Sequence, residues 1–239
     1  MFEALVGYSS LDGQSDLSGE GPDHPAHYVS WNMAADFANS LSLQEGLAEC
    51  YQCSGSESTV ECVEAEDSGT VYDCNGYRLP TEAEWELAAR SGSSDEFWTG
   101  DGSAMGGSYS SNTCAGDETI QDGSTGPLLA DYAWFCGNNS PSGAKEVAQL
   151  VPNGFGLYDM HGNVREWTND LYAEMYPASE EDPTNETSGS DRMLRGGEWL
   201  NHPWNARASS RFNAAPWYPD SYYGFRLVRT VQDDSSPDC

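Results

Sequence analysis

Two acidic residues in a glycine-rich segment are the best candidates for chemistry in this chain. Asp159 and Glu166 stand on either side of Gly162, which together with Asn163 is typical of a tight turn. The alternation that begins at Val164 predicts a strand, in which the carbonyls of Gly162 and Val164 point to the same side. Two carboxylates and two carbonyls are hard oxygen ligands of the kind that Ca2+ prefers. The pattern predicts one Ca2+ site; the alternative is a glycine-rich loop with two solvated acids.

Four motifs in order carry a resemblance to a known family. They are residues 153–167 (NGFGLYDMHGNVREW), 77–90 (YRLPTEAEWELAAR), 195–199 (RGGEW) and 224–229 (GFRLVR). The motifs resemble signatures of the formylglycine-generating enzyme, or sulfatase-modifying factor, family. The resemblance implies an α+β fold, a variant of the C-type lectin fold with two main helices, long loops and little regular secondary structure. It also implies that the Ca2+ ligands are those named above: Asp159, Gly162, Val164 and Glu166.

The same resemblance predicts that the catalytic residues of the family are missing here. Its members oxidise a cysteine of a sulfatase to formylglycine with O2, using two cysteines that bind copper, and thiolates suit Cu(I) because they are soft ligands. Aligning Gly196 and Gly197 with the family motif places these positions at Asn201 and Ala206. We therefore expect no copper, no catalytic residue and a catalytically degenerate member. The alternatives are a formylglycine-generating oxidase with unfamiliar ligands, and an oxidase whose iron a partner domain supplies.

Residues 199–223 are rich in aromatic and amide side chains, which are enriched in binding surfaces. The candidate binding residues are Asn201, His202, Trp204, Asn205, Phe212, Trp217, Tyr218, Tyr222 and Tyr223. Neighbouring prolines place Trp204, Trp217 and Tyr218 in loops, so we expect these three to be exposed and Trp199 to be in the core. The segment predicts binding of a protein, peptide or glycan. It also resembles the diversified segment of variable proteins made by diversity-generating retroelements, which is an alternative function.

Charge excludes two classes of partner. The chain of 239 residues has 39 acidic and 10 basic residues and a net charge of -29. Repulsion of phosphates excludes nucleic acid, and it disfavours anionic membrane surfaces. No apolar run reaches the roughly 18 residues of a membrane span, so we expect no membrane insertion. A structural accessory domain of a larger multidomain parent is a further alternative.

Seven cysteines suggest disulfides and an oxidising compartment. The predicted pairs are Cys53–Cys62, Cys50–Cys74 and Cys114–Cys136, which leaves Cys239 over. The alternative is a zinc site formed by the first four of these cysteines. We expect a secreted, periplasmic or cell-surface protein, although the N-terminus lacks the features of a signal peptide.

Two helices are expected to position these residues. Ser30 can cap a helix over residues 31–43, and Thr81 with Glu84 forms a capping box for a second helix that Gly92 ends. We expect a single domain over residues 1–239 that lacks the first strands of the family, with an acidic tail at residues 231–239.

Overall fold

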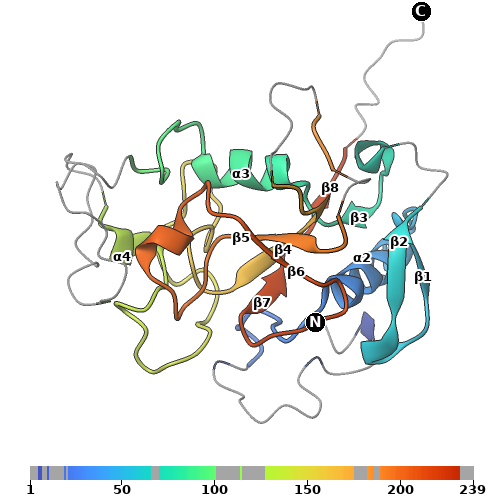
Figure 1. The fold of residues 1–239 in the computed structure, drawn as a ribbon, viewed down its shortest axis with the longest axis horizontal. Helices are drawn as coiled ribbons and strands as arrows, with labels where there is room; N and C mark the ends of the chain where they lie inside the picture. The colour runs from blue at the N-terminus through green and yellow to red at the C-terminus, as the bar shows by residue number, and fades with distance from the viewer. Residues whose placement is uncertain are drawn as a thin grey trace, which may run out of the picture.

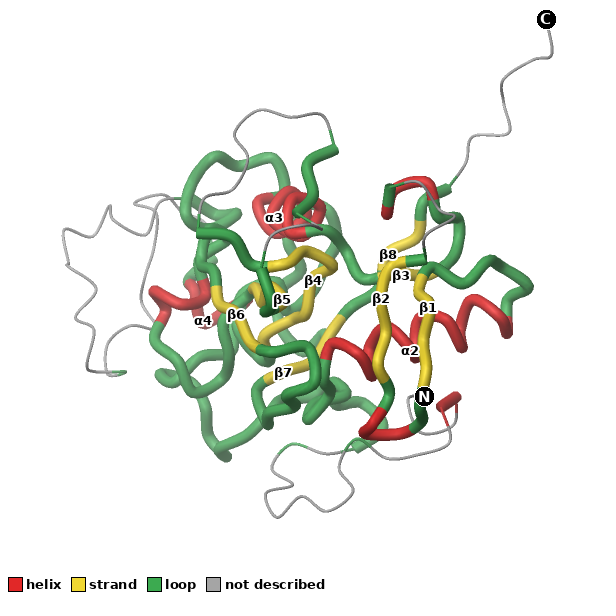
Figure 2. The backbone as a smooth tube through the Cα atoms, turned by 45° about the vertical axis from the view of Figure 1, so that its right-hand side comes forward, coloured by secondary structure: helices red, strands yellow, loops and turns green. Residues whose placement is uncertain are grey.

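The computed structural model combines helices with small sheets and long loops. It describes residues 5–6, 10, 19, 21–65, 70–100, 114, 127–174, 182–185 and 189–231. The long helix α2 (Trp31–Gln44) and the hairpin of β1 (Tyr51–Ser54) and β2 (Glu61–Glu64) lie side by side in Figures 1 and 2. A four-stranded sheet lies next to them, with α3 (Glu82–Arg90) over it. Residues 101–126 apart from Cys114, all of the acidic tail except Val231, and with it Cys239, lie outside the described residues.

Helix α2 (Trp31–Gln44) begins where the sequence predicts. Ser30 is extended, and its hydroxyl accepts a hydrogen bond from the backbone N–H of Met33 at 3.2 Å. The indole of Trp31 is fully buried and donates to the carbonyl of Thr168 at 2.9 Å. The hydrogen bond therefore joins the start of α2 to the central sheet.

Strands β1 (Tyr51–Ser54) and β2 (Glu61–Glu64) form the small hairpin, with the 3-10 turn η1 (Glu57–Thr59) between them. Cys53 lies opposite Cys62 and the two are joined by a disulfide, while Cys50 is joined to Cys74. Asn39 of α2 donates to the carbonyl of Tyr51 at 2.7 Å and fixes the hairpin against the helix. Since all four cysteines are paired, the zinc alternative is wrong.

The central sheet has the order β6-β5-β4-β7. Its strands are β4 (Arg165–Leu171), β5 (Arg192–Arg195), β6 (Phe212–Ala214) and β7 (Tyr223–Phe225). Strand β7 is parallel to β4, and the other pairs are antiparallel. Residues 166–170 of β4 are all buried, because α2 packs against one side of the sheet and α3 against the other. The three C-terminal motifs, at residues 153–167, 195–199 and 224–229, thus contribute to one sheet.

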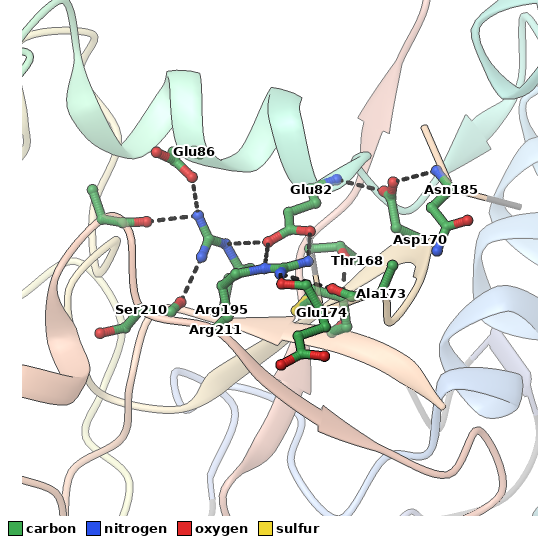
Figure 3. Close-up of polar contacts among 12 residues, drawn as sticks. Glu82, Glu86, Thr168, Asp170, Ala173, Glu174, Asn185, Arg195, Ser210 and Arg211 are labelled. Carbon is green, nitrogen blue, oxygen red and sulfur yellow. Dashed lines mark hydrogen bonds and ion pairs between the residues drawn. The ribbon is translucent and has the colours of Figure 1, made fainter. Parts of the chain in front are cut away.

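Helix α3 (Glu82–Arg90) has the predicted capping box between Thr81 and Glu84. It ends one residue earlier than expected, because Ser91, with a φ of 50°, takes the left-handed position that we assigned to Gly92. The buried Glu82 points from α3 to Arg195 and Arg211 in the sheet region (Figure 3). The helix is therefore fixed to the sheet by ion pairs as well as by apolar contacts.

The remaining described elements are short. They are η3 (Val71–Asp73), β3 (Tyr77–Arg78), α4 (Leu129–Tyr132), η6 (Pro203–Ala206) and β8 (Val228–Arg229), and β3 pairs with β8. Within the described part of the chain, no helix has the length and apolar character needed to cross a bilayer.

Candidate functional site

The predicted calcium loop has the backbone that the sequence implies. Gly162 and Asn163 both have left-handed φ values, 92° and 63°, and β4 follows them. Asp159 is also left-handed, with a φ of 57°. Asp159, Val164 and Glu166 line one cavity of about 360 Å³. Three of the four predicted ligands therefore come together, and Gly162 is not on the lining of this cavity.

The two carboxylates of this cavity differ in how they are satisfied. One oxygen of Asp159 accepts from the backbone N–H of Ala148 at 2.8 Å, and the other, which is buried, has no hydrogen-bond partner. Burial raises the pKa of Asp159, and the nearby charge of Glu166 raises this pKa further. An orphaned buried carboxylate oxygen next to a second carboxylate is a fit for a divalent cation.

Glu166, in contrast, already has a cationic partner. Both of its oxygens accept from the guanidinium of Arg226, at 2.5 and 2.6 Å, and the indole of Trp85 donates to it at 2.6 Å. This bidentate pair joins the glycine-rich motif to the last motif of the chain. A cation at this site would compete with Arg226 for the carboxylate of Glu166. The sequence did not indicate this competition.

Asn201 and Ala206, the positions that the resemblance assigns to the copper ligands, do not fit copper. Ala206 has no donor atom and is buried, and it packs in an apolar cluster with Phe97 and Phe135. Asn201 donates through its amide to Glu198 and accepts from Asn205 at 2.7 Å. Neither position offers the soft ligand that Cu(I) requires.

The candidate binding residues divide into exposed and supporting ones. The side chains of Phe212, Trp204, Trp217 and Tyr218 are 40%, 47%, 67% and 45% exposed, and we call these four the aromatic face. Asn201, His202, Asn205 and Tyr222 are half-buried. The exposure of Trp204, Trp217 and Tyr218 and the burial of Trp199 are as predicted.

Tyr223 is a correction to the predicted binding residues. It is only 6% exposed, because its ring packs edge-on against the buried Trp167 with centroids 5.4 Å apart. Its ring also contacts Tyr218 at 6.4 Å and Phe212 at 6.2 Å. Tyr223 therefore supports the aromatic face from below and is not part of it.

A chain of contacts joins the two ends of the candidate surface. The guanidinium of Arg165 lies 3.8 Å above the ring of Phe212 and pairs with Glu198 at 3.1 Å. Glu198 in turn accepts from Asn201, which leads to η6 and the exposed Trp204. The segment from η6 through β6 to β7 crosses the near side of the molecule in Figure 1. Contacts of Arg165, Glu198 and Asn201 therefore join β6 to η6 beneath the exposed rings.

Glu198 is the buried titratable group in the middle of this chain of contacts. Burial raises its pKa from 4.5 to about 7, and the attraction of Arg165 opposes this change only in part. Asp170 is shifted in the same direction, to about 7, again chiefly by burial. Burial lowers the pKa of His161 to about 4, so this imidazole is neutral at pH 7. It is a core residue whose Nδ1 donates a hydrogen bond to the carbonyl of Ala206.

These values predict that stability depends on pH. The contribution of Glu198 to stability is fully present below pH 4.5 and is lost as pH rises through about 7, because its folded-state pKa is the higher one. The contribution of Asp170 to stability is likewise lost as pH rises through about 7. The contribution of His161 changes in the opposite direction, because it is lost as pH falls from 6.5 to about 4. As pH falls from about 7 to 4.5, the unfolding free energy of wild type should rise by on the order of 3 kcal/mol relative to that of Glu198→Gln, at about 1.4 kcal/mol per pH unit.

Urea unfolding of both proteins at a series of pH values measures this difference. The variant Glu45→Gln removes an exposed acid at the end of α2 and serves as the control. A difference between wild type and Glu198→Gln that stays constant with pH would contradict the assignment.

The family follows from a match along nearly the whole chain. The model described as sulfatase-modifying factor enzyme 1-like domain (FGE-sulfatase) matches residues 7–231, and the chain belongs to this family. It is 31% identical over 228 residues to a protein named chaperone protein LppX from Paenibacillus barcinonensis, covering 91% of this chain and 74% of that one. It is 30% identical over 227 residues to the formylglycine-generating enzyme of Streptomyces coelicolor, covering 90% of this chain and 55% of that enzyme.

Solved structures confirm the fold class. The chain is similar to Treponema denticola variable protein 1, with a TM-score of 0.71 and 28% identity over 96% of this chain and 80% of that one. It is also similar to PvdO from Pseudomonas aeruginosa, with a TM-score of 0.60 and 25% identity over 89% of this chain and 64% of that one. The predicted family and its α+β fold are thus both confirmed.

Two features of the site were missed by sequence reasoning. Arg226 stands within a motif that we recognised, but nothing in its spacing indicates a pair with Glu166. The third disulfide, Cys114–Cys136, was predicted, but its contact with His202 was not. Both features join segments that are far apart in sequence.

Proposed function

We propose that this chain is a binding member of the sulfatase-modifying factor family that recognises a protein or an extended peptide through its aromatic face. The observation that carries the proposal is the exposure of Trp204, Phe212, Trp217 and Tyr218, on segments that the contacts of Arg165 and Glu198 join. Exposed tryptophan and tyrosine supply most of the energy of many protein interfaces, whereas single exposed apolar residues are common. The absence of donor atoms at Ala206 supports a role other than copper chemistry.

The shape of the surface favours an extended partner over an enclosed small molecule. The cavity beside Phe212, bordered by Arg165, Gly197 and Asn205, has a volume of about 30 Å³. Pockets for small molecules are roughly 300–1,000 Å³, so this one is an order of magnitude too small. A protein or peptide partner would lie across the rings. A glycan that stacks on the rings is the alternative ligand, and the experiment below distinguishes the two.

The test compares wild type with Trp217→Ala on peptide, protein and glycan arrays. For any partner that binds wild type, the variant should bind about tenfold or more weakly, the usual effect at a hot spot. Leu43→Ala, which removes an exposed apolar side chain from α2, is the matched control and should bind as wild type does. Equal binding by Trp217→Ala to every captured partner would contradict the proposal.

The same purified protein tests the enzymatic alternative. Loaded with Cu(I) and given a sulfatase peptide that contains cysteine, it should consume no oxygen above a protein-free control. Turnover to formylglycine would replace the proposed binding role with an oxidase.

A variable binding protein is the second candidate. The structural similarity to Treponema denticola variable protein 1 favours it. Sequencing the gene from many cells of one population would support this function if substitutions gather in the codons for residues 199–223. Identical sequences in all cells would count against it.

We also propose that the chain acts outside the cytosol and that Ca2+ binds at Asp159, Val164 and Glu166, with Gly162 as a further ligand. Three disulfides support the oxidising compartment, whether secreted, periplasmic or on the cell surface. The orphaned oxygen of Asp159 in the cavity with Glu166 supports the ion. The ion would fix the loop that leads into β4 and so support the aromatic face.

Calcium is therefore expected to raise the melting temperature. A free Ca2+ concentration of about 100 times Kd would add about 2.7 kcal/mol to the unfolding free energy, and excess EDTA would remove it. Asp159→Asn keeps the side-chain shape and should lose the response, whereas Glu146→Gln, which removes an exposed acid nearby, should keep it. Melting curves of wild type that do not move with Ca2+ or EDTA would rule out the site.

A further inference from the structure

A cluster of soft metal ligands lies beside Asn201, the position to which the resemblance assigns the first copper-binding cysteine. The Sγ atom of Cys136 is 3.6 Å from Nδ1 of His202, and Cys136 is bonded to Cys114. The two sulfurs and an imidazole nitrogen of His202 all lie within 4.8 Å of one another. Among the described residues, these three form the one group of histidine, cysteine and acidic side chains that is compact enough to share an ion.

The backbone holds two of the three ligands firmly in place. The N–H of Cys136 donates to the carbonyl of Asn201 at 3.0 Å. His202 is the residue before η6, and its carbonyl accepts from the N–H of Asn205 at 2.9 Å. Cys136 also packs against the apolar cluster that contains Ala206. The cluster therefore borders both positions that lack a cysteine, although its ligands come from other parts of the sequence.

This disulfide is also the more accessible to a reductant. Cys114 and Cys136 are both half-buried, whereas Cys50, Cys62 and Cys74 of the other two bridges are buried. An imidazole next to a sulfur favours the thiolate form of that sulfur. The Cys114–Cys136 bridge is thus the one that thiol reagents should open first.

We propose that reduction of the Cys114–Cys136 disulfide creates a site for a thiophilic cation, Cu(I) or Zn2+, with Cys114, Cys136 and His202 as its ligands. A dithiol supplies two electrons and two protons, the S–S bond breaks, two thiols form and the dithiol becomes a disulfide. Binding of the cation releases the two thiol protons to solvent and leaves two thiolates and one neutral imidazole around it.

The ligand set selects the class of cation. Thiolates and imidazole suit Cu(I) and Zn2+, while hard cations such as Ca2+ and Mg2+ prefer oxygen. Three protein ligands leave one position open for water or a further ligand if the ion is Zn2+. The net charge of -29 favours any cation over an anion at this surface. This site shares His202 with the candidate binding residues, but it uses no residue of the aromatic face and none of the Ca2+ loop.

The experiment measures metal binding to the full chain before and after mild reduction. Alkylation and mass spectrometry first identify the dithiol concentration that opens Cys114–Cys136 alone. Cu(I) is then titrated without oxygen against a colorimetric chelator, and Zn2+ is titrated in a parallel experiment. The metal with the lower Kd is the one that the site prefers. The reduced protein should bind one equivalent that the oxidised protein does not bind.

Two variants make the result decisive. Cys114→Ser with Cys136→Ser keeps every other cysteine, including Cys239, and should lose the equivalent. His202→Ala keeps the disulfide, which preserves the fold if the double variant proves unstable, and should weaken binding about tenfold or more after reduction. Equal binding by the reduced parent and the double variant, unchanged affinity in His202→Ala, or no binding in either arm would each overturn the proposal.

Discussion

Replacing Glu82 with alanine is expected to lower the free energy of unfolding by roughly 3–5 kcal/mol, because the change leaves two arginines without their shared partner. Glu82 is buried at the start of α3 and binds Arg211 through both oxygens, at 2.7 and 2.8 Å (Figure 3). It also lies 3.6 Å from the guanidinium of Arg195, whose side chain is fully buried. Glu86 contacts Arg195 as well, but from a partly exposed position.

Urea unfolding with the disulfides intact measures this effect. Leu87→Ala removes an exposed side chain from the same helix and should cost well under 1 kcal/mol, about the usual limit for surface changes. Glu82→Gln keeps the volume of the side chain and separates the loss of charge from the loss of packing. If Glu82→Ala and Leu87→Ala unfolded at the same urea concentration, the ion pairs would contribute nothing to stability.

Gly162→Ala is expected to be the second most damaging substitution, at roughly 2–5 kcal/mol. A Cβ atom on Gly162 would lie 1.9 Å from the carbonyl oxygen of Trp134, and backbone cannot yield as a side chain does. The left-handed φ of 92° adds a cost of about 1–2 kcal/mol for any residue with a Cβ. The loop that carries the proposed Ca2+ ligands depends on this close approach.

Gly156→Ala provides the matched control. Gly156 has a similar φ of 80°, but a Cβ atom there would meet nothing within 4 Å. Alanine at this position should therefore cost only the left-handed strain, about 1–2 kcal/mol. Thermal unfolding of the two variants side by side isolates the steric clash. Equal melting temperatures for the two variants would mean that the contact with Trp134 can relax without cost.

Both substitutions act on the support of the aromatic face and leave its exposed residues unchanged. Arg195 and Arg211 border the small cavity beside Phe212, and Gly162 leads into β4, which carries Arg165. We therefore expect partner binding to fall with stability in Glu82→Ala and Gly162→Ala. Trp217→Ala should instead lose binding at unchanged stability, which separates recognition from folding.

The local structure of this protein could be predicted from its residues. Ser30, Thr81 and Glu84 cap the two main helices because a cap satisfies backbone N–H groups within one turn. The pair Cys53–Cys62 closes the hairpin between nearby residues, and the glycine turn at Gly162 leads directly into β4. Each of these features depends on neighbours in sequence, so its pattern can be read from the residues.

The contacts between distant groups, in contrast, follow from how the elements pack. Glu166 and Arg226 are 60 residues apart, and His202 is 66 residues from the sulfur that it contacts. Tyr223 belongs to the core because Trp167 and Phe212 close over it, which its own segment does not specify. Such contacts are set by how whole elements pack, and a residue's type does not name its partner in space. The sequence could therefore locate the family motifs, while packing determined their charges, burial and neighbours.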